Sequence, residues 1–336
     1  MNKTRSRVRM ITLGVAITGV VSFVTSASAQ TVIALPPNLK PLPASNFSLV
    51  ADTNGGHTLR FSTTSWNSGT GPLQLEAGSV DTGSGKQQVF QRVFNNDGTS
   101  ALFFAGWFEW HPSHNHFHFD DYALYTLQPV NAPGGYQLTG SKTTFCVIDT
   151  TKINTSLPGA PQQAIYSTCG REIQGMSVGW GDTYGSQLPG QELDFTGNAD
   201  GTYQLKIEID PNKNIVESNK NDNVSCVLLS IKKPSTVTVL DGSGSCSTVQ
   251  SITPNSALMG TSVGVTITGF GFTEGMTVSF QGGNGPRPVA SNVVVTENKI
   301  TATVTVPFKK QPGKDPVWDL RVGNGVLRNA FTVEQR

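Results

Sequence analysis

Short apolar runs that alternate with polar residues, divided by turn residues, constrain this chain to a β fold. Residues 201–209 place Tyr203, Leu205, Ile207 and Ile209 at every second position, which is the period of a half-buried strand. Similar runs recur at residues 58–63, 88–94, 122–127, 142–147 and 224–231. No segment keeps a helical period over about three turns. The chain is therefore expected to be all-β and antiparallel.

The 336 residues are too many for one small domain and suggest two. Residues 30–233 are expected to form an antiparallel β-sandwich with long loops. Residues 234–247 are rich in Ser, Thr and Gly, a composition typical of a linker. Residues 248–336 hold a further series of short alternating runs, which predicts a second, immunoglobulin-like sandwich.

Residues 1–29 have the features of a secretory signal peptide. Basic residues begin at Lys3, residues 10–24 are largely apolar, and Ala27-Ser28-Ala29 gives a small-residue cleavage site. The apolar run is short for a membrane span, and no later stretch holds eighteen apolar residues in a row. We expect an exported protein, secreted to an extracellular or periplasmic space, with no membrane span after cleavage. An uncleaved membrane anchor is the alternative.

Removal of residues 1–29 leaves 20 basic against 23 acidic residues, a net charge of −3. This mild acidity argues against nucleic acid or an anionic membrane surface as a partner.

The four cysteines point to disulfide bonds, because exported proteins meet an oxidising environment. Four cysteines allow three pairings. Pairing Cys146 with Cys169 and Cys226 with Cys246 closes the shortest loops and is the pairing we predict. A four-cysteine zinc site is the alternative, but the CxxC spacing that usually marks one is missing from the sequence.

Four of the five histidines fall within residues 111–118. His114, His116 and His118 alternate, so a strand would present all three on one face, whereas a helix would turn His116 away. Imidazole is the commonest transition-metal ligand, and the spacing predicts a three-histidine metal site on a strand. His111 precedes Pro112, lies out of phase with that face, and is expected to support the ligands without binding the metal.

The spacing of the histidines does not choose the metal. Zinc at this site would indicate a hydrolase that activates a bound water, and copper would favour redox or O₂ chemistry. Iron is a third option. Three neutral imidazoles with an open coordination position could hold any of these three metals.

The histidine run and several other segments together resemble the lysyl oxidase family. The run from Glu109 to His118, followed by Asp120 and Asp121, resembles that family's copper-binding segment. Further segments are similar to family sequences upstream of the copper site, around the cofactor lysine, around the cofactor tyrosine and in the final strands: Gln91–Val93 with Asn96–Ser100, Gly140–Thr150, Gln174–Ser177 with Asp182–Tyr184, and Gly201–Lys206 through Asn223–Val224.

The resemblance implies a bacterial-type lysyl oxidase-like enzyme that binds Cu(II) through His114, His116 and His118. It implies a lysine tyrosylquinone cofactor made from Lys142 and Tyr184, with Asp149 as the catalytic base. The implied reaction is oxidation of a primary amine, either peptidyl lysine or a small amine, by O₂. The aldehyde, hydrogen peroxide and ammonia are the implied products.

Residues 252–272, with Ile252-Thr253-Pro254 and Gly269-Phe270-Gly271-Phe272, resemble IPT/TIG immunoglobulin-like domains. Such a domain implies a spacer or a module that binds an extracellular protein or polysaccharide surface. It also keeps open a second function, a non-catalytic copper-binding or adhesion protein. A three-histidine zinc hydrolase remains the third.

Overall fold

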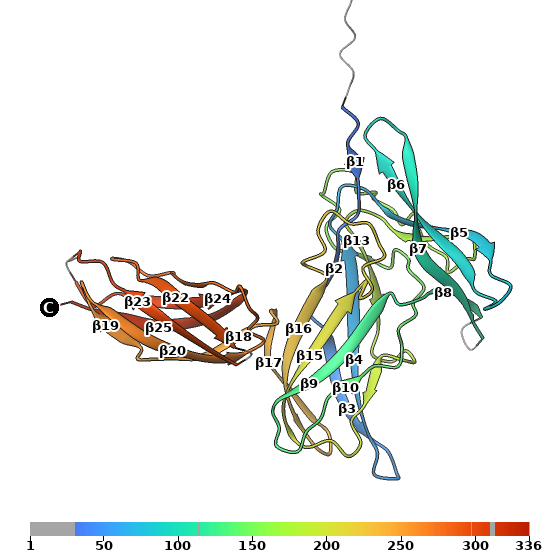
Figure 1. The fold of residues 1–336 in the computed structure, drawn as a ribbon. Helices are drawn as coiled ribbons and strands as arrows, with labels where there is room; N and C mark the ends of the chain where they lie inside the picture. The colour runs from blue at the N-terminus through green and yellow to red at the C-terminus, as the bar shows by residue number, and fades with distance from the viewer. Residues whose placement is uncertain (1–30, 113–114, 297, 310–312, 336) are drawn as a thin grey trace, which may run out of the picture. The chain divides into compact units, whose positions relative to one another are not determined.

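A computed structural model describes residues 31–112, 115–296, 298–309 and 313–335. Every regular element in these residues is a β-strand, which confirms the all-β prediction (Figure 1). No part of the described chain forms a helix that is long and apolar enough to cross a membrane. The predicted signal peptide and the predicted ligand His114 lie outside the described residues.

Three sheets lie between residues 34 and 244. One has the strand order β12 (Ile173–Met176), β5 (Leu73–Val80), β6 (Gln87–Asn95), β7 (Ser100–His111), β8 (His116–Phe119), with β1 (Ala34–Leu35) paired to β6. The next has the order β10 (Leu138–Thr139), β9 (Ala123–Asn131), β15 (Gly201–Ile209), β16 (Val224–Lys232), β17 (Thr236–Gly244). The third has the order β11 (Thr151–Lys152), β13 (Trp180–Tyr184), β4 (His57–Asn67), β14 (Glu192–Asp194), with β2 (Leu39–Pro41) and β3 (Ser45–Ala51) paired to β4.

These three sheets share one hydrophobic cluster, and β15 supplies its clearest pattern. Tyr203, Leu205, Ile207 and Ile209 are all buried, as their alternation predicts. Each such side chain contributes about 2 kcal/mol of hydrophobic free energy when it leaves water. β15 pairs antiparallel with β9 and β16, so the predicted strand is a central strand of its sheet.

Both predicted disulfide bonds, Cys146–Cys169 and Cys226–Cys246, are present. The first joins the segment after Lys142 to the loop before β12. The second joins Cys226 on β16 to Cys246, which lies two residues after the end of β17. All four cysteines are therefore used, and none is left free in the part of the chain that the structure describes.

Two segments differ from their expected local structure. Residues 236–244, expected to belong to a linker, form strand β17, which pairs with the edge of β16. Its residues are Thr- and Val-rich at 236–239, and this β-propensity outweighs the glycines that follow. The domain boundaries themselves remain a prediction.

Residues 142–147, expected to form a strand, have only one isolated bridge, between Phe145 and Phe119. Their other backbone groups bond elsewhere: the Val147 N–H donates to the Gln174 side chain, and the Tyr122 N–H donates to the Thr143 carbonyl. This segment therefore crosses over the end of β8 without joining a ladder, which brings Lys142 close to the histidines.

Residues 248–334 form two four-stranded sheets that share a separate hydrophobic cluster. The first has the order β18 (Thr248–Thr253), β20 (Ser262–Phe270), β23 (Lys299–Thr305), β22 (Val289–Thr296). The second has the order β19 (Ser256–Leu258), β25 (Gly325–Glu334), β24 (Val317–Val322), β21 (Val278–Gln281). Of the described strand pairs, β19 with β25 is the one that is parallel.

The half-buried carboxyl group of Glu217 predicts a pH effect on stability. Burial raises the pKa of Glu217 from 4.5 to about 7, against opposing hydrogen bonds from Asn223 and the Leu39 N–H. The protonated form is therefore favoured on folding. The contribution of Glu217 to the free energy of unfolding is fully present below about pH 4.5 and is lost as the pH rises through about 7. The loss amounts to up to about 3 kcal/mol. Urea unfolding at pH 5 and pH 8 should show a smaller loss for Glu217→Gln than for the wild type, and an identical loss would contradict this assignment.

Candidate active site

His111 lies on β7, and His116 and His118 lie on β8, the strand that runs beside it (Figure 1). The register pairs His111 with His116 and Glu109 with His118, so all four point to one face of the sheet. The expected single strand across residues 114–118 is therefore shorter, because β8 begins at His116. Asn115 turns the chain with a φ of 55°. His111 is on the same face as His116 and not out of phase with it.

The imidazoles of His116 and His118 converge. Their Nε2 atoms lie 2.8 Å apart, and the His118 Nδ1 lies 3.0 Å from the Thr144 hydroxyl. The ring centroid of His111 is 4.6 Å from that of His118. Two facing nitrogens at this distance need a proton or a cation between them, and Thr144 orients the outer nitrogen of His118 as metal-ligating histidines require.

The electrostatic surroundings keep at least one of these rings in its ligand form. Burial lowers the pKa of His116, and the nearby His111 and Lys142 lower it further. The neutral imidazole is the form that binds metals.

The donor set fits a metal with nitrogen ligands, such as copper or zinc. Within the part of the chain that the structure describes, no three His, Cys, Asp or Glu side chains form a complete metal-binding group. The third predicted ligand, His114, lies outside that part. His116 and His118 are therefore the two predicted ligands that the structure brings together.

The opposite face of the hairpin anchors it in the core. Phe108 and Phe119 are buried, and their rings meet edge to face with centroids 6.1 Å apart. Trp110 and Phe117 form a second edge-to-face pair nearer the turn. Such pairs add about 1 kcal/mol beyond the area that they bury. The histidine face is thus held by aromatic packing from behind.

Lys142 and Tyr184 lie close together. The Lys142 Nζ is 5.6 Å from the Tyr184 ring centroid and 5.0 Å from that of Phe145. The Tyr184 hydroxyl donates to the Cys146 carbonyl at 2.8 Å. Two residues that are forty-two positions apart in the sequence therefore share one site, as the lysyl oxidase resemblance requires of its cofactor pair.

Burial shifts both groups toward their uncharged forms. Burial lowers the pKa of Lys142, against the opposing charges of Glu192 and Asp182. Burial also raises the pKa of Tyr184, and the neighbouring Asp182 raises it further. An amine with a lowered pKa is more often unprotonated at neutral pH and is then a nucleophile.

A cavity of about 420 Å³ opens beside Tyr184. Lys142 lines a separate hollow together with His111, and Pro189 borders both. The walls of the cavity beside Tyr184 are mainly apolar and include the Cys146–Cys169 disulfide, Ile148, Leu188 and Pro189. His116 and Tyr184 both line it, and Asp182 is the one carboxylate among the described residues that line it. An apolar cavity with a few convergent polar groups is the usual form of a small-molecule site.

Asp149, the residue that the resemblance assigns as catalytic base, does not line this cavity in the described structure. Its Oδ1 accepts from the Ser177 N–H, and its Oδ2 accepts from the Ser177 hydroxyl and the N–H groups of Ile165 and Tyr166. A buried carboxylate with four donors holds a loop together. This arrangement favours a structural role for Asp149.

Three residues of the site had no predicted role: Asp182, Thr144 and Gly190. Asp182 and Tyr184 are two positions apart on β13, so alternation places them on the same face. That spacing is visible in the sequence. Thr144 and Gly190 carry no such signal, because their roles depend on contacts with His118 and Lys142 that only the fold creates.

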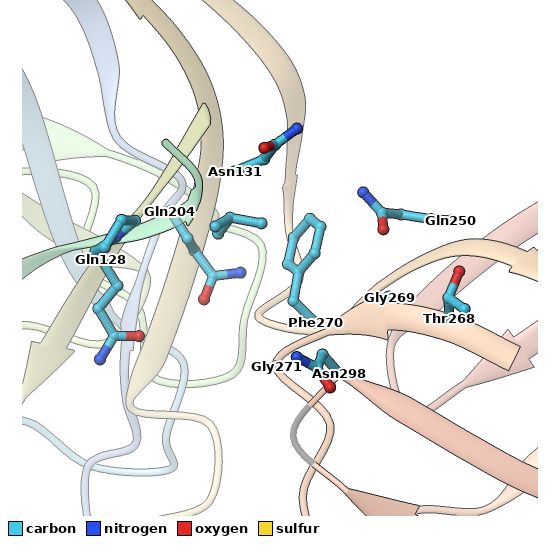
Figure 2. Close-up of a pocket in the computed structure, with 11 residues that line it drawn as sticks. Gln128, Asn131, Gln204, Gln250, Thr268, Gly269, Phe270, Gly271 and Asn298 are labelled. Atoms are coloured by element: carbon cyan, nitrogen blue, oxygen red, sulfur yellow. The ribbon is translucent and has the colours of Figure 1, made fainter. Parts of the chain in front are cut away.

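A second hollow is lined by the side chains of Gln128, Gln204, Gln250, Asn298 and Phe270, with others (Figure 2). Amide groups dominate its wall. None of the described residues that line it titrates near neutral pH, so it offers no acid or base. The chemistry therefore belongs to the cavity beside Tyr184.

The segment that holds this site is similar to a known protein family. Residues 84–239 match the family model of lysyl oxidase, and this range includes His116, His118, Lys142 and Tyr184. The match supports the lysyl oxidase family. Protein-lysine 6-oxidase from Homo sapiens is 33% identical over 139 residues, which are 40% of this chain and 31% of that protein.

Other relatives belong to the same family and match a similar share of this chain. Protein-lysine 6-oxidase from Sus scrofa is 32% identical over 139 residues, covering 40% of this chain and 52% of that protein. Lysyl oxidase homolog 1 from Homo sapiens is 32% identical over 117 residues, covering 34% of this chain and 19% of that protein. The chain thus spans about half or less of the length of these lysyl oxidase relatives.

Among solved structures, domains 4 and 5 of the S-layer protein SbsC overlap 89% of this chain and 97% of that chain. The identity is 11% and the TM-score is 0.19. A score this low does not indicate a shared fold.

Proposed function

We propose that this protein is a secreted, copper-dependent amine oxidase of the lysyl oxidase type. It converts a primary amine, water and O₂ into an aldehyde, ammonia and hydrogen peroxide. The observation that carries the proposal is the distance of 5.6 Å between the Lys142 Nζ and the Tyr184 ring, at a cavity bordered by His116. A lysine over an aromatic ring is a common contact, but here the lysine also lies close enough to His116 to lower the pKa of that imidazole.

The cofactor that this pair would form is lysine tyrosylquinone, and Cu(II) would be held by His116 and His118 with His114 as third ligand. One lysine side chain, one tyrosine side chain and two O₂ give the cofactor, one water and one hydrogen peroxide. This cofactor would supply an electron acceptor for the amine, which ordinary amino-acid side chains do not provide. Burial of Lys142 favours the unprotonated amine that this bond requires.

The chain's own residues bind and enclose the substrate. Ile148, Leu188 and Pro189 would contact the carbon stem of the amine, and the disulfide closes the far wall. Because these walls are apolar, they favour a primary amine on an uncharged stem, such as a lysyl side chain. Lys86 forms ion pairs with Glu109 and Asp120, and neither of these carboxylates lines the cavity.

The test is to express the protein with copper in air and look for the cofactor directly. We expect a visible quinone absorbance band, and a crosslinked peptide that has gained one oxygen atom and lost four hydrogen atoms. Both should be absent in Lys142→Arg and in Tyr184→Phe. Lys152→Arg is the matched control, because the Lys152 Nζ lies 5.5 Å from the Trp180 ring in a comparable contact.

Copper-loaded protein without band or crosslink would contradict the oxidase and favour a non-catalytic copper-binding protein. Protein that retains zinc and hydrolyses test esters would favour the zinc hydrolase.

We further propose that residues 248–336 are an IPT/TIG-type sandwich that acts as a spacer or binds an extracellular protein or polysaccharide surface. The two sheets around one cluster support this proposal, as does the sequence pattern around Thr253-Pro254. Export to an oxidising compartment is supported by the two disulfides. Loss of polysaccharide or cell-surface binding on deletion of these residues is the expected result.

A further inference from the structure

Asp182 is a buried acid with an unused oxygen. It is 3% exposed and lies on β13, two residues before Tyr184. Its Oδ1 lies 3.5 Å from the Thr150 hydroxyl, whereas its Oδ2 has no hydrogen-bond partner among the described residues. Buried carboxylates almost always have both oxygens satisfied, so an unpartnered one at a cavity wall calls for an explanation.

The surroundings of Asp182 favour proton transfer. Burial raises its pKa well above the ordinary value, against hydrogen bonds from Ile148 and Thr150, and the nearby Asp149 raises it further. A carboxyl group with a raised pKa is a stronger base than an exposed one once it is ionised. The charged and titratable groups that face it are Lys142, Asp149, Tyr122, Tyr125 and Tyr184.

We propose that Asp182, and not Asp149, is the catalytic base of this site. This inference rests on the proposed amine oxidase function. Asp182 lines the cavity beside Tyr184 and has a free oxygen, whereas Asp149 uses both oxygens to bind Ser177, Ile165 and Tyr166. Four accepted hydrogen bonds occupy both oxygens of Asp149, and none of these four donors belongs to a residue that lines the cavity.

The step that we assign to Asp182 is removal of a proton from the carbon that carries the amine. The C–H bond breaks, and the proton passes to the Asp182 carboxylate. The electron pair of that bond is the pair that O₂, as terminal oxidant, finally receives when it becomes hydrogen peroxide. The buried Oδ2 accepts no hydrogen bond from the described residues, so the carboxylate keeps lone pairs that are not already used by donors.

Asp182→Asn tests this role, since the amide keeps the shape and cannot accept the proton. We expect the quinone band to remain and kcat to fall about a hundredfold or more. With a substrate deuterated at the amine-bearing carbon, the isotope effect on kcat/KM should rise toward its full primary value. Asp194→Asn, an exposed aspartate on β14, is the matched control and should turn over normally.

The outcomes separate the two proposals. Wild-type protein without band or turnover contradicts the oxidase and the base together. A normal wild type with unchanged turnover in Asp182→Asn overturns the base assignment alone. Loss of the band in a folded Asp182→Asn protein also overturns it, because Asp182 would then act in cofactor formation.

Asp182→Glu keeps the inference testable if the asparagine variant does not fold. The glutamate retains a carboxylate in the same cavity with a different pKa. We expect the acid limb of its kcat/KM profile to shift from the wild-type position, because that limb reports protonation of the base. An acid limb that stays in place would overturn the assignment.

Discussion

The Asp149→Ala variant is expected to unfold with a free energy about 4 kcal/mol lower than that of the wild type. The substitution leaves the buried N–H groups of Ser177 and Tyr166, and the half-buried N–H of Ile165, without their acceptor. Each buried donor that loses its acceptor costs about 1–3 kcal/mol. Because Asp149 joins the loop around residue 165 to the segment before β13, its loss loosens two segments at once. Urea unfolding at neutral pH measures the change.

Asp97→Ala serves as the comparison, because Asp97 also accepts from a backbone N–H and a hydroxyl, both of Thr99, but in an exposed turn. That variant should unfold almost as the wild type does. If Asp149→Ala kept wild-type stability and lost only turnover, the structural role of Asp149 would be wrong and the base role implied by the resemblance would stand.

Much of the fold could be predicted from the period of the sequence. The alternation in residues 201–209 predicted a strand, and β15 has those bounds. The disulfide pairs followed from loop length alone. Both inferences succeed for the same reason, which is that neither needs knowledge of which distant segment packs against the element concerned.

In the histidine segment, the alternation of residues was not sufficient to predict where the strand begins. Alternation continues from His114 to His118, so the sequence contains no sign that β8 begins only at His116. The turn depends on Asn115 in a left-handed conformation, which Asn adopts more readily than most residues. The pairing of His111 with His116 follows from that turn. Because the sequence does not reveal the turn, His111 was predicted to lie out of phase with the other histidines.

The roles of the two aspartates could not be separated from the sequence. Asp149 and Asp182 both follow β-prone residues and both lie near proposed cofactor residues. What separates them is the number of donors that tertiary structure brings to each: four for Asp149, and none to the Oδ2 of Asp182 within the described residues. Those donors come from segments that are up to 28 residues away in the sequence.

Gly190→Ala is expected to reduce the yield of the Lys142–Tyr184 crosslink about tenfold or more. Gly190 has a φ of +82°, and a Cβ there would lie 2.5 Å from Lys142 Cδ and 2.8 Å from Lys142 Cβ. The lysine stem must therefore move away from the ring that it now faces. A displacement of about 1 Å from reactive geometry is enough for a hundredfold loss of rate, so a tenfold loss of yield is a conservative figure.

Gly159→Ala is the control that separates the steric clash with Lys142 from the backbone strain of an alanine at positive φ. Gly159 has a φ of +81°, almost that of Gly190, but no described atom lies within 4 Å of the position that a Cβ would take there. Both variants should lose about 1 kcal/mol of stability, because alanine is strained at positive φ. Only Gly190→Ala should lose the quinone band and the crosslinked peptide. Equal loss in both variants would mean that backbone strain, and not the position of the Lys142 stem, controls formation of the cofactor.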